Sequence, residues 1–203
     1  LVLTAAFAFA AAPGETVYQN GFLSIEDAHQ SIELPDGYFL ELILSEPQIE
    51  EPVACAWDGN GVLYVAEMRT YMQSVDAKGE QEPRSRISRH EDSNGDGTYD
   101  RHSVFIDNIL LPRAILPLDD RVMVHLTNTL DLWNYRDTDG DGVADEKVKI
   151  YGGGHRGGNM EHQPSGLIWN LDNWIYLTYE NTRYRFTDGQ VVTEKIPRGS
   201  GQW

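Results

Sequence analysis

The sequence has 203 residues, of which 40% are hydrophobic and 24% charged, a composition typical of a globular protein with one sizeable core. Its 32 acidic residues outnumber the 16 Lys and Arg, so the net charge is −16 and no basic patch is evident. This balance argues against nucleic acid and against an anionic membrane as partners.

Cys55 is the single cysteine, which excludes an intrachain disulfide. Because the segment has no CxxC or CxxCH motif, it holds neither a c-type haem site nor a zinc knuckle. The apolar run around Cys55 predicts a small buried residue.

Residues 1–12 are apolar, rich in alanine and too short to span a bilayer, and they contain A-x-A steps. These features predict the remnant of a secretory signal peptide, with a short buried helix as the alternative. No later segment reaches transmembrane length. We therefore expect an exported protein, periplasmic or extracellular, with no transmembrane span in this segment.

Residues 13–33 are polar and mixed, and form a predicted lead-in with a short helix at 25–30. From residue 34 the pattern changes to strands and turns, and residues 34–203 are predicted to be one domain. Leu34–Gly37 reads as a turn, because Pro, Asp and Gly favour turns. Tyr38–Leu44 reads as a strand.

A unit of two apolar strands joined by a tight Asp/Asn/Gly turn then occurs three times. The pairs are 53–58 with 62–66, 114–118 with 122–126, and 166–170 with 174–178. A third strand follows each pair, at 87–91, 132–136 and 183–186, and a fourth at 103–106, 147–151 and 191–194. Equating Tyr64, Val124 and Tyr176 gives repeat intervals of 60 and 52 residues.

Four strands per repeat are typical of the blades of a β-propeller. A β-sandwich also has short strands, but it would not repeat the same four-strand unit three times. The predicted fold is therefore all-β, a propeller of four-stranded antiparallel blades, with Trp57, Trp133, Trp169 and Trp174 in the blade cores. Three blades do not close a ring. Since residues 199–203 resemble the entry to another blade, we expect the N-terminal part of a larger, six-bladed propeller.

Two acidic loops share the spacing D-x-[DN]-x-D-G-x-x-D and sit between the third and fourth strands of the first two repeats. Their candidate ligands are Asp92, Asn94, Asp96 and Asp100 in one loop, and Asp137, Asp139, Asp141 and Asp145 in the other. Such oxygens converge on a hard cation, and the glycine at the sixth position permits the sharp turn, so calcium is the predicted ligand. Neither loop has the bidentate Glu of an EF-hand at its twelfth position, which favours weaker, structural binding. An Asp/Gly hairpin without metal is the alternative.

A glycine-rich connection, Gly152–Leu167, carries two histidines into the third repeat. His162 stands just before the strand at 166–170, where a histidine can act as a general base. His155 is a second candidate, for cofactor binding. Structural or surface histidines are the alternative for both. Glu67 and Arg69 follow the strand 62–66, so both side chains are expected at the rim of the central channel, as cofactor contacts or as a plain ion pair.

The ordered series Glu46–Ala54, Trp57–Arg69, the acidic loops, and His162 through Tyr176 resembles the propeller of the putative membrane-bound dehydrogenases of planctomycetes and verrucomicrobia. Those proteins often carry a C-terminal c-type haem domain, and their propeller is similar to that of soluble quinoprotein glucose/sorbosone dehydrogenases. The resemblance covers residues 34–203. It implies a pyrroloquinoline quinone (PQQ) cofactor, a sugar or alcohol substrate, haem c on a further domain and a cytochrome c electron acceptor.

By this resemblance, His162 is the base that takes the hydroxyl proton as hydride passes to the quinone, and Glu67 matches the family's strand-end Glu. Gly166 departs from the pattern, because the family has Arg there. The family's other quinone contacts and its cofactor calcium come from later blades, and the two acidic loops are a separate feature. Two other functions stay open: a non-catalytic propeller that binds glycans or proteins, and a lactonase-type hydrolase. The peripheral position of the acidic loops counts against the second.

Overall fold

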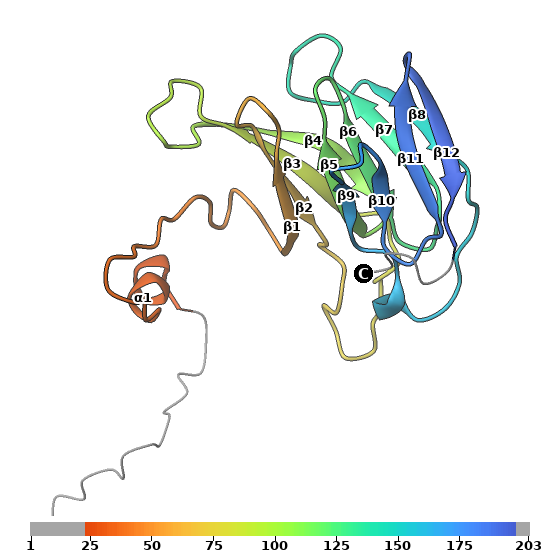
Figure 1. Cartoon of the computed structure of the whole chain (residues 1–203). Coiled ribbons are helices and arrows are strands. Elements are labelled where there is room, and N and C mark those ends of the chain that lie inside the picture. Colours follow the sequence, from red (N-terminus) through yellow and green to blue (C-terminus); the bar gives the residue numbers. More distant parts are fainter. Residues whose placement is uncertain (1–22, 198–203) are drawn as a thin grey trace, which may run out of the picture. The chain divides into compact units, whose positions relative to one another are not determined.

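The computed structural model describes residues 23–197 (Figure 1). The predicted signal-peptide remnant and the predicted entry to a further blade lie outside the described residues, as do residues 13–22 of the predicted lead-in. The chain divides into two compact units, Leu1–Leu42 and Ile43–Trp203. Among the described residues, no helix is long and apolar enough to cross a membrane.

The first unit contains the expected short helix, α1 (Ile25–Gln30). Ser24 caps it, because its hydroxyl accepts a hydrogen bond from the Asp27 amide at 3.0 Å. The strand expected at Tyr38–Leu44 is wrong, since these residues form no strand. Tyr38 and Phe39 are 74% and 84% exposed. An apolar, β-prone segment without a neighbouring strand has no partner for its backbone, and it does not form a strand alone.

The second unit contains three four-stranded sheets, which we call blades 1, 2 and 3. Blade 1 has β1 (Pro52–Trp57), β2 (Leu63–Glu67), β3 (Ser85–Glu91) and β4 (Arg101–Ile109). Blade 2 has β5 (Pro112–Pro117), β6 (Val122–Leu126), β7 (Leu132–Arg136) and β8 (Glu146–Tyr151). Blade 3 has β9 (Leu167–Trp169), β10 (Ile175–Leu177), β11 (Thr182–Thr187) and β12 (Gln190–Lys195).

All twelve strands predicted from the repeats are present. Within each sheet the strands follow chain order, and every neighbouring pair is antiparallel. The first strand of blade 2, β5, lies against both β1 and β9, so the first strands of the three sheets are neighbours. Successive four-stranded sheets assembled around their first strands form a partial β-propeller, which confirms the predicted fold.

Apolar cores fill the spaces between consecutive blades. Between blades 1 and 2, Tyr64 and Phe105 pack edge to face at 5.1 Å in a cluster that includes Val124. Between blades 2 and 3, Met123 packs in a second cluster with Tyr184, which is fully buried. Burying one such large apolar side chain contributes about 1.5–3 kcal/mol, so these two cores account for much of the stability of the blade stack.

The cores correct the alignment of the repeats. Met123 and Val124 are adjacent in β6 and enter different cores, because successive strand residues point to opposite faces. Tyr64 packs in the core toward the following blade, whereas Val124 packs in the core toward the preceding one. The proposed equivalence of Tyr64 with Val124 is therefore wrong by one residue, and Met123 is the structural counterpart of Tyr64.

Strand alternation also explains three errors about burial. Along β1, Ala54 and Ala56 pack against the core while Cys55 and Trp57 point away from it, and both of the latter are exposed. Trp169 is likewise 56% exposed at the end of β9. The prediction of core tryptophans holds for Trp174, which is 7% exposed. An apolar run predicts a strand, but which face is covered depends on the neighbouring blade.

Candidate functional site

The connections between strands lie at two opposite ends of the blades. In an antiparallel sheet the first-to-second and third-to-fourth connections share one end, and the second-to-third connection lies at the other. The acidic loops 92–100 and 137–145 therefore lie at what we call the loop end (Figure 1). The opposite end, which we call the histidine end, carries the connections 68–84, 127–131 and 178–181 together with the β8–β9 connection, 152–166.

Both acidic loops are closed by the same pattern of hydrogen bonds. The first aspartate accepts from the amides of the fourth and sixth residues, and the ninth accepts from the hydroxyl of the second. The bonds to Asp92 and Asp137 come from Gly95, Gly97, Gly140 and Gly142 at 2.7–2.8 Å, and those to Asp100 and Asp145 come from Ser93 and Thr138 at 2.9 and 2.7 Å. The repeated aspartates therefore order the loop itself.

These amide donors keep the first aspartate ionised. The Gly97 N–H holds the pKa of the Asp92 carboxyl below its usual value. Burial raises the pKa of Asp137, but the N–H groups of Gly142 and Gly140 lower it more, and the net shift is downward. Ionised carboxylates are the form that a divalent cation requires.

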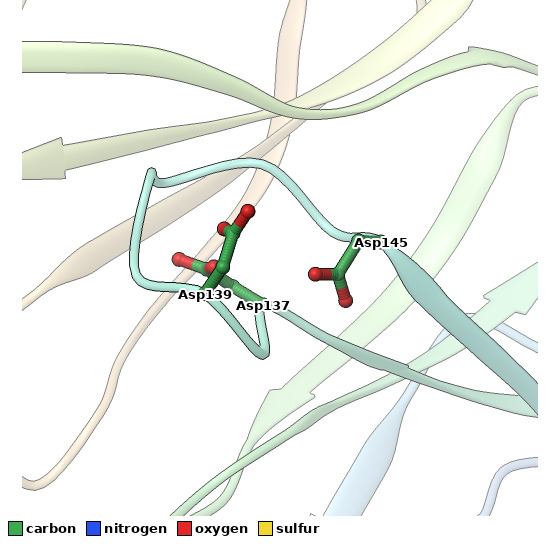
Figure 2. A group of neighbouring side chains, drawn as sticks. All are labelled: Asp137, Asp139 and Asp145. Carbon is green, nitrogen blue, oxygen red and sulfur yellow. The ribbon is translucent and has the colours of Figure 1, made fainter.

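The second loop brings three carboxylates together. Asp137, Asp139 and Asp145 each offer an oxygen, and these oxygens lie within 4.8 Å of one another (Figure 2). Asp141 instead accepts the amide of Val143 at 2.8 Å. In the described part of the chain no other group of three such residues is found, so Asp92, Asp96 and Asp100 of the first loop, with Asn94 between them, are not gathered in this way.

The second loop also joins two blades. Ser103 of β4 donates its hydroxyl proton to the Gly142 carbonyl at 2.6 Å, and the Ala144 amide donates to the Phe105 carbonyl at 2.9 Å. Gly142 is buried with φ of +90°, and a Cβ there would lie 2.8 Å from the Ser103 Oγ. Only glycine allows this close approach, so Gly142 both turns the loop and fits it against blade 1.

His162 lies at the histidine end, where it completes a short 3₁₀ turn, η1 (Met160–His162), just before β9. Its side chain is exposed, and within residues 23–197 its ring makes no hydrogen bond. The backbone around it is fixed, because its amide donates to the Asn159 carbonyl at 3.1 Å and its carbonyl accepts from the Arg156 guanidinium. The geometry therefore gives an accessible imidazole on an ordered backbone.

Several residues of the β8–β9 connection are bound to blade 2. His155 forms an isolated antiparallel bridge with Thr129. Arg113 of β5 donates to the Met160 carbonyl at 2.5 Å, and the Gln163 side chain accepts the Asn128 amide at 3.3 Å. Gln163 is only 1% exposed, which makes it an internal anchor of the segment.

His125 is a further buried histidine close to this connection. Its Nε2–H donates to the Thr129 carbonyl at 2.8 Å, while its Nδ1 has no partner in the described structure. Burial lowers the pKa of His125 to about 4. The ring is therefore neutral at physiological pH and acts as a structural donor.

Glu67 and Arg69 do not pair with one another. Glu67 is fully buried and forms two bonds of 2.9 Å with Arg86, besides accepting the Glu50 amide at 2.6 Å. Arg69 pairs with the Glu50 carboxylate at 2.7 Å, with 35% of its side chain exposed. The expected ion pair between them is thus replaced by two pairs that bind β2 to β3 and to the segment before β1. Cofactor binding by Glu67, Arg69 and His155 stays a prediction.

Arg69 lines a polar cleft of about 530 Å³ at the histidine end of blade 1. Four carboxylates and two arginines line it: Glu46, Glu50, Glu51, Asp107, Arg69 and Arg84. The excess of negative charge suits a polyhydroxy or cationic ligand better than an anionic one.

The sequence model of a family described as Domain of unknown function (DUF7133) matches residues 24–199. The chain belongs to this family. No curated protein matches the sequence. Among solved structures, the chain is similar to a gluconolactonase from Xanthomonas campestris, at 11% identity and a TM-score of 0.49, over 79% of this chain and 52% of that one. It is also similar to a catalytically inactive virginiamycin B lyase from Staphylococcus aureus, at 13% identity and a TM-score of 0.35, over 80% of this chain and 61% of that one. The chain thus spans about half the length of the gluconolactonase.

Sequence reasoning missed the residues that hold the histidine end together. Arg113 and Gln163 act on backbone carbonyl and amide groups from another connection. Tyr71 bonds Glu161 at 3.4 Å, which brings the β2–β3 loop to the same place. Such contacts follow from the arrangement of the blades and have no local motif. The one sequence feature that could have indicated an anchor is Gln163, a polar residue directly after His162.

Proposed function

We propose that this chain is part of an exported propeller enzyme that acts on a small sugar or alcohol at the histidine end, with His162 as the general base. The observation that carries the proposal is the exposed His162 ring on a backbone fixed by Arg156, Asn159 and the neighbouring Arg113 contact. A fixed backbone limits the positions of the ring, and free ring nitrogens can accept a proton from a substrate hydroxyl. The substrate class rests on the resemblance to sugar dehydrogenases and on the polar cleft beside Arg69.

The hydride acceptor implied by that resemblance is PQQ, which carries three carboxylates. The described residues do not fit it well. In the cleft beside Arg69, four carboxylates face two arginines. At the β8–β9 connection, Arg113 and Arg156 already donate to backbone carbonyls. We therefore assign no reaction step to the quinone from this chain and restrict the proposal to proton transfer at His162.

We also propose that the acidic loops bind calcium, with the second loop as the stronger site. Support comes from the three gathered carboxylates of Asp137, Asp139 and Asp145 and from the amide donors that keep Asp137 ionised. Calcium takes six to eight oxygen ligands, so water and carbonyl oxygens complete its shell. Since this loop lies between the third and fourth strands and contacts β4, the ion would be structural.

The enzymatic proposal is tested with the full-length protein and a panel of sugars, alcohols and sugar lactones. Dye reduction is measured after addition of PQQ and calcium, and lactone hydrolysis in parallel. We expect His162→Ala to lower kcat by about 10²–10⁴ with a small change in KM, as for removal of a general base. His29→Ala, which changes an exposed histidine of the first unit, is the control.

Each outcome is informative. Dye reduction that depends on His162 supports the dehydrogenase. Lactone hydrolysis that depends on His162 keeps the base but assigns the enzyme to the hydrolases. Turnover that survives in His162→Ala places the base elsewhere. No turnover in either assay contradicts the proposal and favours a non-catalytic propeller that binds glycans or proteins.

A further inference from the structure

A cavity of about 320 Å³ lies between blades 2 and 3 at the loop end. Its walls come from the β5–β6 turn (Leu118–Arg121), from Trp169 and Asn173 beside the β9–β10 turn, and from Phe186 of β11. The cavity and His162 lie at opposite ends of blade 3, because His162 precedes β9 and the β9–β10 turn follows it. It therefore belongs to a different surface from the histidine end.

The cavity exists because two equivalent connections differ in length. Between blades 1 and 2, the loop 137–145 folds back and bonds to Phe105 and Ser103 of β4. In blade 3 the corresponding connection is the two-residue turn Asp188–Gly189, with φ of +51° and +76°, which is typical of a tight hairpin. This turn is too short to fold back in the same way. The space at the end of the blade 2–3 core is left open.

Trp169 forms an accessible aromatic wall. In strand register it pairs with Ile175, as Pro117 pairs with Val122 in blade 2, so a large flat ring stands where blade 2 has a proline. The indole Nε1–H donates to the Asn173 Oδ1 at 2.9 Å, which restrains the ring, yet the residue remains 56% exposed. Phe186 adds a second ring, over which the Arg121 guanidinium lies at 5.2 Å.

The rim carries polar groups of balanced charge. The lining includes two carboxylates, Asp119 and Asp120, and two guanidinium groups, Arg121 and Arg185, so the formal charges cancel. Asp120 is held by Arg121 at 2.9 Å and by Arg136 at 3.1 Å. Asp119 is exposed, and its carboxylate has no hydrogen bond or ion pair among the residues described. It is therefore a free acceptor at the edge of an aromatic wall.

We propose that this cavity binds a neutral sugar ring. A pyranose presents an apolar C–H face, which suits the electron-rich face of Trp169, and hydroxyls at its edge, which donate to Asp119. A charged ligand gains nothing from a rim without net charge, and a purely aromatic ligand leaves the Asp119 acceptor unused. The volume lies at the low end of the roughly 300–1,000 Å³ typical of small-molecule pockets, which suits one or two rings.

The test is calorimetric titration of the full chain with the methyl glycosides of glucose, galactose and mannose, with 4-nitrophenol as an aromatic probe. We expect saturable binding of at least one glycoside. Trp169→Ala should weaken it about tenfold, the effect of losing one aromatic contact. Trp169→Phe keeps an aromatic face and should retain most of the affinity, while Asp119→Ala should weaken it.

Two matched controls come from the same sheet and from the first blade. Ile168 is adjacent to Trp169, is 55% exposed and points to the opposite face, so Ile168→Ala should bind normally. Trp57 is a second exposed tryptophan, 52% exposed, and Trp57→Ala should also bind normally. Since His162→Ala should leave this binding unchanged, failure of the enzymatic proposal and failure of this one are distinguishable.

The proposal is overturned by three results. One is the absence of saturable binding for every glycoside. Another is equal loss of affinity in Trp169→Ala and Ile168→Ala, which would show a change in the fold. The third is binding of 4-nitrophenol without binding of any glycoside, which would assign the cavity to aromatic ligands.

Discussion

The Ala144 amide donates to the Phe105 carbonyl at 2.9 Å, so an acidic loop of blade 2 is bonded to the last strand of blade 1. The three gathered carboxylates, Asp137, Asp139 and Asp145, belong to this same loop. Any ion held there therefore stabilises the contact between two blades as well as the loop itself. The stability of the stack should accordingly depend on divalent cations.

We predict that calcium raises the Tm of the protein and that a chelator reverses the effect. A ligand at 100 times its Kd adds about 2.7 kcal/mol to the free energy of unfolding. Asp139→Asn should remove most of the shift, because Asp139 is a candidate ligand and the bond that its carboxylate accepts from the Asp141 amide, at 3.3 Å, is weak. Thermal denaturation with and without calcium measures this. Asp119→Asn, another exposed acid, is the control, and an equal calcium shift in both variants would contradict the prediction.

Removal of the Glu67 carboxylate should strongly destabilise blade 1. Glu67 is fully buried and Arg86 has 16% of its side chain exposed, so Glu67→Ala leaves a nearly buried cation unpaired. Breaking a buried pair in this way costs about 3–5 kcal/mol. Urea denaturation should show it as a lower midpoint. Glu82→Ala breaks an exposed pair with Arg84 and should change stability by less than about 1 kcal/mol.

The free energy of unfolding should decrease as the pH is lowered from about 6.5 to about 4. Burial lowers the pKa of His125 to about 4, and burial together with the neighbouring His102 lowers the pKa of His90 to about 4 as well. The ordinary value for an unfolded histidine is 6.5, so in this interval the unfolded state binds more protons than the folded one. The stabilisation is complete above pH 6.5 and is lost as the pH falls toward 4.

The measurement is the free energy of unfolding as a function of pH, for the unmodified protein and for His125→Gln. Glutamine can still donate to the Thr129 carbonyl but does not titrate. The variant should show a shallower slope between pH 6.5 and 4, whatever its stability at pH 7. An unchanged slope would mean that His125 is not the titrating group.

Gly166→Ala should destabilise blade 3 by about 1–3 kcal/mol, as overpacking does. A Cβ at Gly166 would lie 2.8 Å from the Thr178 Cγ2. Thr178→Ser removes that methyl group and keeps the hydroxyl that accepts the Ser165 and Gly166 amides, at 2.9 and 3.0 Å. The double variant should therefore regain stability relative to Gly166→Ala. Independent, additive losses in a double-mutant cycle would refute this contact.

The strands and turns were predictable because their signals are local. Alternating apolar residues and Asp/Asn/Gly turns define each hairpin without reference to the rest of the chain. Burial was predictable only in part, because it depends on the blade that covers each face. Cys55 and Trp57 lie in an apolar run, yet alternation places them on the face opposite Ala54 and Ala56.

The residues of the candidate site also differ in how far the sequence predicts them. The acidic loops were found from spacing, because the hydrogen bonds that close each loop join residues within the loop itself. The partners of Glu67 and the anchors of the β8–β9 connection were not, because Arg86 and Arg113 reach them from other strands. The polar cleft beside Arg69 likewise combines residues from before β1, from the β2–β3 connection and from the end of β4, and no sequence motif connects them.

The position of His162 depends on residues that are distant from it in the sequence. Arg113, Asn128 and Asp131, all of blade 2, hold the connection through Met160, Gln163 and Gly154. Blade 2 thus supplies three of the contacts that hold this connection, beside Tyr71 of the β2–β3 loop at Glu161 and Thr178 of blade 3 at Ser165 and Gly166. A single replacement of Arg113 should therefore disturb the histidine from a distance, because it removes the bond to the Met160 carbonyl.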